Sequence, residues 1–225
     1  MAYSCTILAD SLSVPWEIRL TTMLVTFPRI VLAEFNTHRV FSRNSASSRA
    51  IPVELQLRKV LEDPFIPVYW GRNQRGMQAA EELGLDHQRD ALREWMSARD
   101  SAVRSVQRLH DIGAHKQIVN RLLEPFMWHT VIVTATIWEN FFALRCAPEA
   151  QPEIRTIAEM MRSSYRAGVP EPLTRGQWHL PLIDNEDREG AQGPLPRDPL
   201  TGEEDRLSWE CLAKISAARC ARVSY

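Results

Sequence analysis

The sequence predicts an α/β or α+β domain that contains more helix than strand. Two segments, residues 17–27 and 130–137, are rich in the β-branched residues that favour strands. Between and after them, apolar residues recur at helical spacing over several longer segments. The chain of 225 residues suits one large domain or two small ones, and it is long enough to bury a substantial core.

The first predicted strand covers residues 17–27, where apolar and polar residues alternate. Pro28 suits the first turn of a helix, because its φ is fixed and no amide donor is needed there. A short helix is therefore predicted from Pro28, with His38 and Arg39 at its C-terminal end. The Ser-rich run that follows is a poor helix former, and we expect irregular backbone there.

The longest helical pattern covers residues 77–112 and has Gly113 as its C-cap. A second helix is predicted over residues 115–123, where it is stopped by Pro125. Residues 130–137 form the clearest strand of the chain, because five of the first six are β-branched.

The C-terminal part of the chain is predicted to contain helices over residues 138–145 and 151–166. Residues 184–206 are rich in Asp, Glu, Gly and Pro, which is typical of a mobile surface loop or linker. The closing segment is predicted to be helical through about Ala218.

Composition narrows the class of protein. Lys and Arg total 27 against 28 Asp and Glu, so the near-neutral charge favours neither a nucleic-acid nor an anionic-membrane partner. The sequence has no apolar run of membrane-spanning length and no signal-peptide pattern. Four cysteines without CxxC spacing argue against a metal or redox motif. We therefore expect a cytoplasmic protein with reduced thiols and no bound metal.

One polar stretch, residues 34–52, is a candidate binding site. It holds one His, three Arg, two Asn and five hydroxyl side chains within 19 residues. Arginine forks, hydroxyls and amides at short spacing suit a phosphate or nucleotide. A Ser-rich connecting loop is the alternative interpretation. For His38 the alternative is a histidine that the helix dipole stabilises at a C-terminus.

Polar residues in two apolar segments are further candidates. Arg121 falls on the predicted apolar side of its short helix, so it should pair with a carboxylate or with a ligand anion. Asn140 and Arg145 need partners too, which a flat aromatic ligand or neighbouring backbone would supply. Cys146 is either a thiol of lowered pKa or a small buried residue.

The polar stretch resembles the signature of the flavin-dependent thymidylate synthases. That signature reads R-H-R, two residues, S, one residue, N-E, one residue, S, one residue, R-Y. In the same register this chain matches at His38, Arg39, Ser42, Asn44, Ser47 and Arg49. It departs at Thr37, Ser45 and Ala50, where the family has Arg, Glu and Tyr.

Later segments resemble the same family in the same order, so that the resemblance covers about residues 18–161. "NRLLEP" is similar to the family's R-x-x-L-P, with Glu124 where leucine is usual. "ENFFALRCAPEAQPEIR" is similar to N-F-L-x-L-R followed by H-A-Q-x-E-I, with Glu149 in place of the histidine. The family's A-R-V-S-Y/F segment usually precedes the signature, but here it is residues 221–225. This order resembles a rearranged, phage-type branch of the family.

The resemblance implies a single domain over residues 1–225, with an antiparallel sheet flanked by helices. It implies a homotetramer with active sites between subunits. It also implies synthesis of dTMP from dUMP, with FAD as cofactor and with NADPH and methylenetetrahydrofolate as co-substrates. In this family the flavin and the folate carry the chemistry, and no enzyme cysteine attacks the uracil ring.

Carried over residue by residue, the resemblance also implies roles in the site. Ser47, Arg49 and Arg121 bind the phosphate of dUMP. Arg145 binds the pyrimidine edge and stabilises the charge that develops there. The residues expected to bind FAD are His38, Arg39, Ser42, Asn44, Asn140 and Ser224.

The departures from the family pattern leave two alternatives open. One is a related flavin-dependent reaction, 5-hydroxymethylation of dUMP or dCMP, because Ser45 and Ala50 replace residues beside the nucleotide. The other is a non-catalytic homologue that binds the nucleotide or the flavin.

Overall fold

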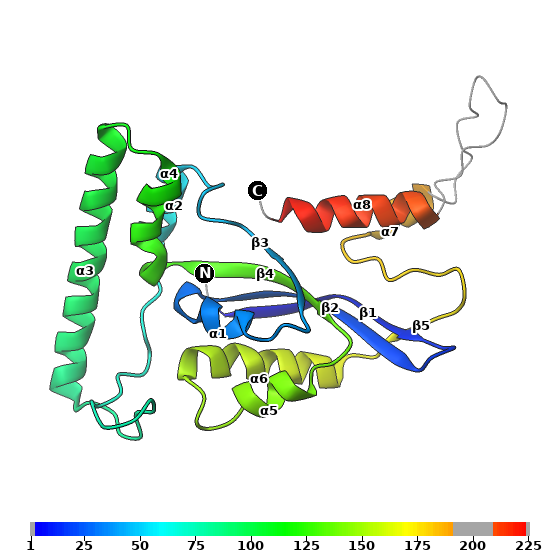
Figure 1. Ribbon diagram of the computed structural model, residues 1–225, viewed down its shortest axis with the longest axis horizontal. Coiled ribbons are helices and arrows are strands. Elements are labelled where there is room, and N and C mark those ends of the chain that lie inside the picture. The colour runs from blue at the N-terminus through cyan, green and yellow to red at the C-terminus, as the bar shows by residue number, and fades with distance from the viewer. Residues whose placement is uncertain (1–2, 191–208, 224–225) are drawn as a thin grey trace.

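The computed structural model describes residues 3–190 and 209–223. At its centre is a five-stranded sheet with the strand order β3-β4-β2-β1-β5 (Figure 1). The first four strands of that order pair antiparallel, and β5 pairs parallel with β1. Their bounds are Ser4–Ser13 (β1), Ile18–Pro28 (β2), Ser42–Ser45 (β3), Trp128–Ala135 (β4) and Glu171–Leu173 (β5). The predicted class, a mixed domain with more helix than strand, is confirmed.

The two central strands, β2 and β4, form the core of the sheet through their β-branched residues. On one face the hydroxyls of Thr22 and Thr134 lie 2.7 Å apart, and those of Thr26 and Thr130 lie 3.0 Å apart. Cross-strand pairs of this kind stabilise antiparallel register. The opposite face carries the buried core residues Met23, Val25 and Val133, so a one-residue slip of register would move these side chains off the core face.

Two helices cover the apolar face of the sheet, α5 (Glu139–Arg145) and α6 (Pro152–Ala167) (Figure 1). The short segments η1 (Arg29–Val31) and α1 (Leu32–Asn36) pack beside them. Large side chains from the sheet and from these helices form the main core; they include Met23, Phe27, Phe35, Trp138, Phe141, Ile154 and Met161. This packing fixes α5 next to the end of α1.

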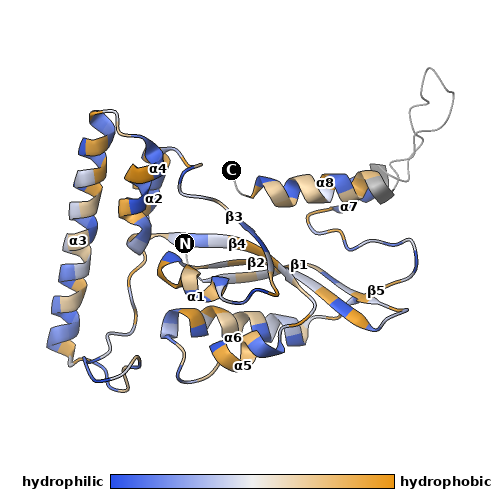
Figure 2. Cartoon of the chain, in the orientation of Figure 1, coloured by the Kyte–Doolittle hydropathy of each residue, from blue (hydrophilic) through white to orange (hydrophobic). Residues whose placement is uncertain are grey.

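A second, smaller core lies at one end of the sheet, between the other helical segments (Figure 1). These are α2 (Val53–Glu62), α3 (Leu85–Asp111), α4 (Lys116–Val119) and η2 (Asn120–Phe126). Figure 2 shows hydrophilic and hydrophobic residues mixed along α3, as expected for a helix with only one packed side. Residues that build this core include Val53, Leu57, Val106 and Leu123.

The described C-terminal elements are α7 (Asn185–Gly190) and α8 (Trp209–Arg222). The hydroxyl of Ser216 donates to the carbonyl of Pro181 over 2.6 Å, and Arg219 forms an ion pair with Asp187. These contacts hold α8 against residues 181–187, so that its end lies near β3 (Figure 1). Among the described helices, none combines the length and the apolar character needed to cross a bilayer.

Most of the predicted elements are confirmed. The strands predicted at residues 17–27 and 130–137 are β2 and β4, and the helices predicted at residues 138–145 and 151–166 are α5 and α6. Gly113 has a φ of 83° after α3, which is the left-handed conformation expected of a glycine C-cap.

Some predicted boundaries are wrong because tertiary pairing overrides local preference. The Ser-rich run was expected to be irregular, but part of it forms β3, since β4 offers its open edge for pairing. The helix predicted from residue 77 begins at Leu85, because an antiparallel bridge joins Gly71 to Glu82. Pro125 does not stop its segment, which is a 3-10 helix that continues to Phe126.

Near the C-terminus the prediction is partly corrected. The segment 184–206 was predicted to be a mobile loop, but Asn185–Gly190 forms α7. The remainder of that segment, residues 191–206, lies outside the described residues. The last helix continues past Ala218 to Arg222.

The first strand, β1, was not predicted, and its polar Asp10 shows why. Asp10 accepts hydrogen bonds from Nε of Arg19 (2.8 Å) and from the hydroxyl of Thr21 (2.8 Å). Arg19 also donates to the carbonyl of Tyr165 at 2.7 Å and lies over the Tyr165 ring at 3.9 Å. The ion pair of Arg19 and Asp10 therefore joins β1 and β2 to α6. It offsets the free-energy cost of burying the Asp10 carboxylate within a strand.

We expect Arg19→Ala to lower the free energy of unfolding by about 3 kcal/mol, because it leaves the Asp10 carboxylate buried without its cation. Urea denaturation measures this change. The matched control is Arg89→Ala, since both partners of the Arg89–Asp86 pair are exposed (76% and 94%). That control should cost under about 0.5 kcal/mol, and equal losses in the two variants would contradict this role of Arg19.

Candidate functional site

The segment with the family-like signature, residues 37–50, runs from the end of α1 through β3 toward α2. Because β3 is an edge strand paired only with β4, Ser42 and Asn44 project to one face of the sheet and Arg43 to the other. The residues after it, 46–52, are called the signature loop below. The polar side chains of this segment therefore lie on the edge strand β3 and on the signature loop.

His38 and Arg145 form the first group of the site. His38 is 6% exposed and packs against the rings of Phe41 and Phe141. Its Nε2 lies 2.9 Å from Nε of Arg145. Burial lowers the pKa of His38, and the positive charges of Arg145 and Arg43 lower it further. The ring is thus neutral, and because Nε2 accepts from the guanidinium, its proton lies on Nδ1.

This finding corrects the alternative interpretation of His38 as a cationic helix cap. The residue lies beyond the end of α1, and its neighbours are cations that disfavour a charged ring. His38 is instead a hydrogen-bond acceptor that orients Arg145.

Arg145 ends α5 and is half-buried against the end of α1. Its Nη2 donates to the hydroxyl of Thr37 (3.1 Å) and to the carbonyl of Glu34 (3.3 Å). Together with the bond to His38, these contacts fix the plane of the guanidinium. No partner of Nη1 is found among the described residues, so that nitrogen is available to a ligand.

The second group of the site is the signature loop with the helical segments that hold it. The side-chain amide of Asn120, which is fully buried, donates to the carbonyls of Ser48 (2.8 Å) and Ile51 (2.9 Å). The ammonium of Lys116 donates to the carbonyl of Ala50 at 3.2 Å. Three carbonyls of the loop are therefore bonded to side chains of α4 and η2, which fixes its conformation without regular structure.

Glu124 joins this loop to the sheet. Its Oε1 accepts from the hydroxyl of Ser48 at 2.8 Å and lies 3.0 Å from Nη2 of Arg29. Nη1 of Arg121 lies 3.5 Å from the same oxygen. The Arg121 side chain is 52% exposed, so the expectation that it faces an apolar interior is wrong. It pairs with a carboxylate, as one of the two alternatives expected, and it is also accessible to a ligand anion.

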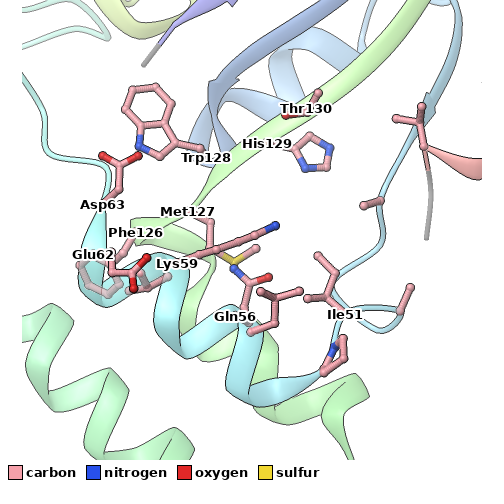
Figure 3. Close-up of a pocket in the computed structure, with 16 residues that line it drawn as sticks. Ile51, Gln56, Lys59, Glu62, Asp63, Phe126, Met127, Trp128, His129 and Thr130 are labelled. Carbon is pink, nitrogen blue, oxygen red and sulfur yellow. The ribbon is translucent and has the colours of Figure 1, made fainter. Parts of the chain in front are cut away.

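A cavity of about 470 Å³ lies between the signature loop, α2 and the start of β4 (Figure 3). Its wall is largely apolar, with Leu55, Val60 and Phe126 among the lining residues. The polar and charged residues that line it are Gln56, Lys59, Glu62, Asp63, His129 and Thr130. The size and the mixed lining are typical of pockets for small organic ligands.

The described end of the chain closes one side of this cavity. The amide Nδ2 of Asn44 donates to the carbonyls of Cys220 (2.7 Å) and Ala221 (3.1 Å), at the end of α8. Val223 then lines the cavity. Ala221, the first residue of the C-terminal motif, is thus brought against β3. Ser224, predicted to bind FAD, lies outside the described residues.

The remaining predicted site residues are exposed or lie on the signature loop. Arg39, Ser42, Arg49 and Asn140 are exposed. Asn140 therefore does not need a partner within an apolar helix, and that argument for it is wrong. Ser47 accepts a hydrogen bond at its hydroxyl from the amide of Arg49, which stabilises the turn of the loop.

Two other sequence alternatives are decided by the structure. Burial raises the pKa of the half-buried Cys146 thiol, with smaller and opposed effects from nearby charges, so the interpretation as an activated thiol is wrong. No group of three or more His, Cys, Asp or Glu side chains in the described part of the chain is arranged to hold a metal ion.

Several residues of the site were missed by the sequence analysis. Asn120 is adjacent to Arg121, but an asparagine in a helical segment carries no signal of its burial. Arg29 and His129 lie 100 positions apart in the sequence, and their side chains meet at 2.9 Å only because β2 pairs with β4. For Glu124 the sequence contained one indication of a role in the site, because this residue stands where the family pattern has leucine.

Comparisons with known proteins agree with these observations. The thymidylate synthase complementing protein family (Thy1) matches residues 5–171. Among solved structures, the fold is similar to that of a UMP/dUMP methylase, PolB from Streptomyces cacaoi, bound with 5-Br UMP, at a TM-score of 0.60 and 19% identity. That match covers 73% of this chain and 88% of the other.

A second structure of the same enzyme, bound with 5-Br dUMP, matches at a TM-score of 0.56 and 18% identity. It covers 73% of this chain and 90% of the other. At this level of identity the likeness concerns the fold. No curated protein matches the sequence.

We expect Asn120→Ala to lower the free energy of unfolding by about 2 kcal/mol, because two loop carbonyls lose their donor. Urea denaturation measures the loss, and hydrogen exchange should show faster exchange of amides in the signature loop. Asn73→Ala is the control, since Asn73 is exposed. If the amides of the signature loop exchange at the same rate in Asn120→Ala and in Asn73→Ala, Asn120 does not fix the conformation of the loop.

Stability should also depend on pH below about 6.5. Burial, followed by the charge of Arg29, lowers the pKa of His129 to about 4. Between these two pH values the unfolded chain binds a proton at this ring and the folded chain does not, so stability falls as pH falls. The loss at His129 reaches up to about 3 kcal/mol below pH 4. Burial lowers the pKa of His179 to about 4 as well, so it adds in the same direction.

Unfolding measured in urea from pH 7.5 to 4 tests this expectation. His129→Phe should show a shallower decline than the wild type, whereas His87→Phe, at an exposed position, should not. A decline of the same slope in all three proteins would exclude His129 as its source.

Proposed function

Since this chain belongs to the thymidylate synthase complementing protein family, we propose that it synthesises dTMP from dUMP with FAD as cofactor. Methylenetetrahydrofolate is the proposed one-carbon donor and NADPH the proposed reductant. The observation that carries the proposal is the Arg145 guanidinium, which His38 and Thr37 fix at the end of α1, and whose Nη1 has no partner among the described residues.

The proposed role of Arg145 follows from its geometry. A guanidinium held by three hydrogen bonds is pre-organised, and the available Nη1 can bind a carbonyl oxygen of a pyrimidine. As electron density moves onto that oxygen during substitution at C5, the fixed positive charge stabilises it without reorganisation. His38 is a positioning residue in this scheme, since its Nε2 accepts from the Arg145 guanidinium and so orients it.

The proposed phosphate-binding residues are Ser47, Arg49 and Arg121. Arg49 and Arg121 are exposed on neighbouring segments, which are joined by the bond of Ser48 to Glu124. Two guanidinium groups at such a position suit a dianionic phosphate through charge-assisted hydrogen bonds. Binding of phosphate would compete with the long contact between Arg121 and Glu124.

The residues present fit a flavin nucleotide. Arg39 and Ser42 offer exposed donors at the start of the edge strand β3, and Asn140 offers one on α5, and these groups suit a ring system with several carbonyl and phosphate oxygens. His38 and Asn44 are already engaged with protein groups, so in this proposal they shape the site rather than bind the flavin through those same atoms. When bound, the flavin supplies the redox chemistry.

The exposure of these groups also supports active sites shared between subunits. In the proposed homotetramer, a neighbouring subunit would cover Arg39, Arg49 and Arg121 and exclude water from the nucleotide. A cytoplasmic location is proposed with it. The solved UMP/dUMP methylase of similar fold, bound with 5-Br dUMP, supports a pyrimidine nucleotide as the substrate class.

A second candidate function is 5-hydroxymethylation of dUMP or dCMP. Ala50, where the family signature has tyrosine, lines the cavity beside the signature loop. Alanine leaves space in the cavity that a tyrosine at this position would fill, and this space favours a changed substrate or product. A non-catalytic homologue remains the third candidate, and flavin uptake separates it from the other two.

The first experiment is to record the visible absorbance of the protein with FAD and then with NADPH, without oxygen, in the presence and absence of dUMP. We expect bound flavin whose reduction is faster with dUMP. Product analysis after methylenetetrahydrofolate is added separates dTMP from a hydroxymethyl product. A protein that retains no flavin but binds dUMP would favour the non-catalytic homologue.

Arg145→Ala should abolish turnover, because the developing charge loses the guanidinium that His38 and Thr37 hold in place, while circular dichroism stays that of the wild type. Arg166→Ala is the matched control, since it removes an exposed arginine near the end of α6. If Arg145→Ala and Arg166→Ala turned over substrate equally, the assignment of Arg145 would be wrong.

A further inference from the structure

One carboxylate lies among the cations of the candidate phosphate site, and the proposed function gives it no role. Oε1 of Glu124 accepts a hydrogen bond from the hydroxyl of Ser48 at 2.8 Å, and it lies 3.0 Å from Nη2 of Arg29 and 3.5 Å from Nη1 of Arg121. A hydroxyl and two guanidinium groups thus share a single carboxylate oxygen. Glu124 stands where the family pattern has leucine, which could make none of these contacts.

The two arginines are held by Glu124 to different degrees. The Arg29 side chain is 12% exposed, and its Nη1 also donates to Nδ1 of His129 at 2.9 Å, so this pair belongs to the interior. The Arg121 side chain is 52% exposed, and its contact is at the outer limit of hydrogen-bond distance. Exposed contacts of this kind contribute little to stability. Arg121 can therefore exchange Glu124 for another anion while Arg29 stays in place.

A phosphate bound by Arg121 would meet the negative charge of Glu124. Arg49 is exposed on the signature loop, and its neighbour Ser48 is bonded to Glu124. A phosphate that bridges Arg49 and Arg121 would share the Arg121 guanidinium with this carboxylate. Two anions on one guanidinium repel each other, because Coulomb energies are large at separations of a few ångströms. The Glu124 side chain is only 27% exposed, so salt and water screen this repulsion in part.

We propose that Glu124 is an internal competitor of the nucleotide phosphate for Arg121. Its carboxylate neutralises Arg121 while the site is empty, and it weakens phosphate binding when the nucleotide enters, so that the nucleotide is released more readily. The assignment of Arg49 and Arg121 to the phosphate rests on the proposed function. A residue that only held the signature loop would have the opposite effect, because its loss would loosen the loop and weaken binding.

Two substitutions separate the charge of Glu124 from its bond to the loop. Glu124→Gln removes the negative charge and keeps an amide oxygen that can accept from Ser48. It should bind phosphate about tenfold more tightly than the wild type, because a negative charge beside the anion is lost. Glu124→Leu removes the charge and the acceptor, so faster hydrogen exchange of the signature-loop amides is expected in this variant alone. Glu81→Gln is the matched control, since Glu81 and its partner Arg72 are both exposed.

Calorimetric titration of the full-length protein with inorganic phosphate, dUMP and deoxyuridine measures these affinities. Glu124→Gln should bind the first two probes about tenfold more tightly, whereas deoxyuridine, which has no phosphate, should bind as it does to the wild type. Glu81→Gln should bind all three probes as the wild type does. In the wild type, the carbon-13 signal of the Glu124 carboxylate should shift when inorganic phosphate is added, and not when deoxyuridine is added. This signal remains decisive if Glu124→Gln fails to fold.

Affinities of Glu124→Gln for phosphate and dUMP that equal or fall below those of the wild type would overturn the proposal. A Glu124 carboxylate signal that does not move at high phosphate concentration would overturn it as well. The proposed function is judged separately, by flavin reduction in the presence of dUMP. A protein that takes up no flavin, but binds phosphate more tightly as Glu124→Gln, would retain this role of Glu124 while the proposed function fails.

Discussion

The geometry of the candidate site depends on two hydrogen bonds that the buried side-chain amide of Asn120 donates. It donates to two carbonyls of the signature loop, at Ser48 and Ile51, and so replaces the backbone partners that an irregular segment lacks. Glu124, one helical turn further on, holds the same loop through the hydroxyl of Ser48. With its backbone fixed in this way, the loop can present polar side chains at defined positions although it belongs to no helix or strand.

The connections continue from this loop into the sheet. Glu124 pairs with Arg29, which directly follows β2, and Arg29 donates to His129 on β4. A carboxylate, a guanidinium and an imidazole therefore link loop and strands, and each member fixes the protonation or orientation of the next. The same physical logic recurs at Arg145, whose guanidinium is oriented by a neutral histidine and by a hydroxyl. In both places buried neutral histidines accept from arginines, which leaves the arginine charges available to ligands or carboxylates.

Local sequence patterns predicted the elements that depend on local properties. The β-branched runs gave β2 and β4, and the apolar spacing gave α5 and α6, because side-chain periodicity and backbone preference agree there. The same analysis missed β1, since Asp10 is tolerated within a strand only through its pairing with Arg19. It missed β3 for a related reason, because a Ser-rich segment becomes a strand only when β4 presents an open edge. The order of polar motifs along the chain was enough to indicate the family that was later found to match residues 5–171.

The sequence by itself determined the mixed fold, the position of its strongest elements, and the set of polar residues from which a site is built. Only the tertiary structure decided which of these residues meet. It pairs His38 with Arg145, exposes Arg121 and Asn140, and brings the C-terminal segment to Asn44. The physical reason is that hydrogen bonds and ion pairs act over a few ångströms between atoms that the chain separates by tens to hundreds of residues. Spacing in a sequence does not contain those distances, whereas strand register and helix packing set them.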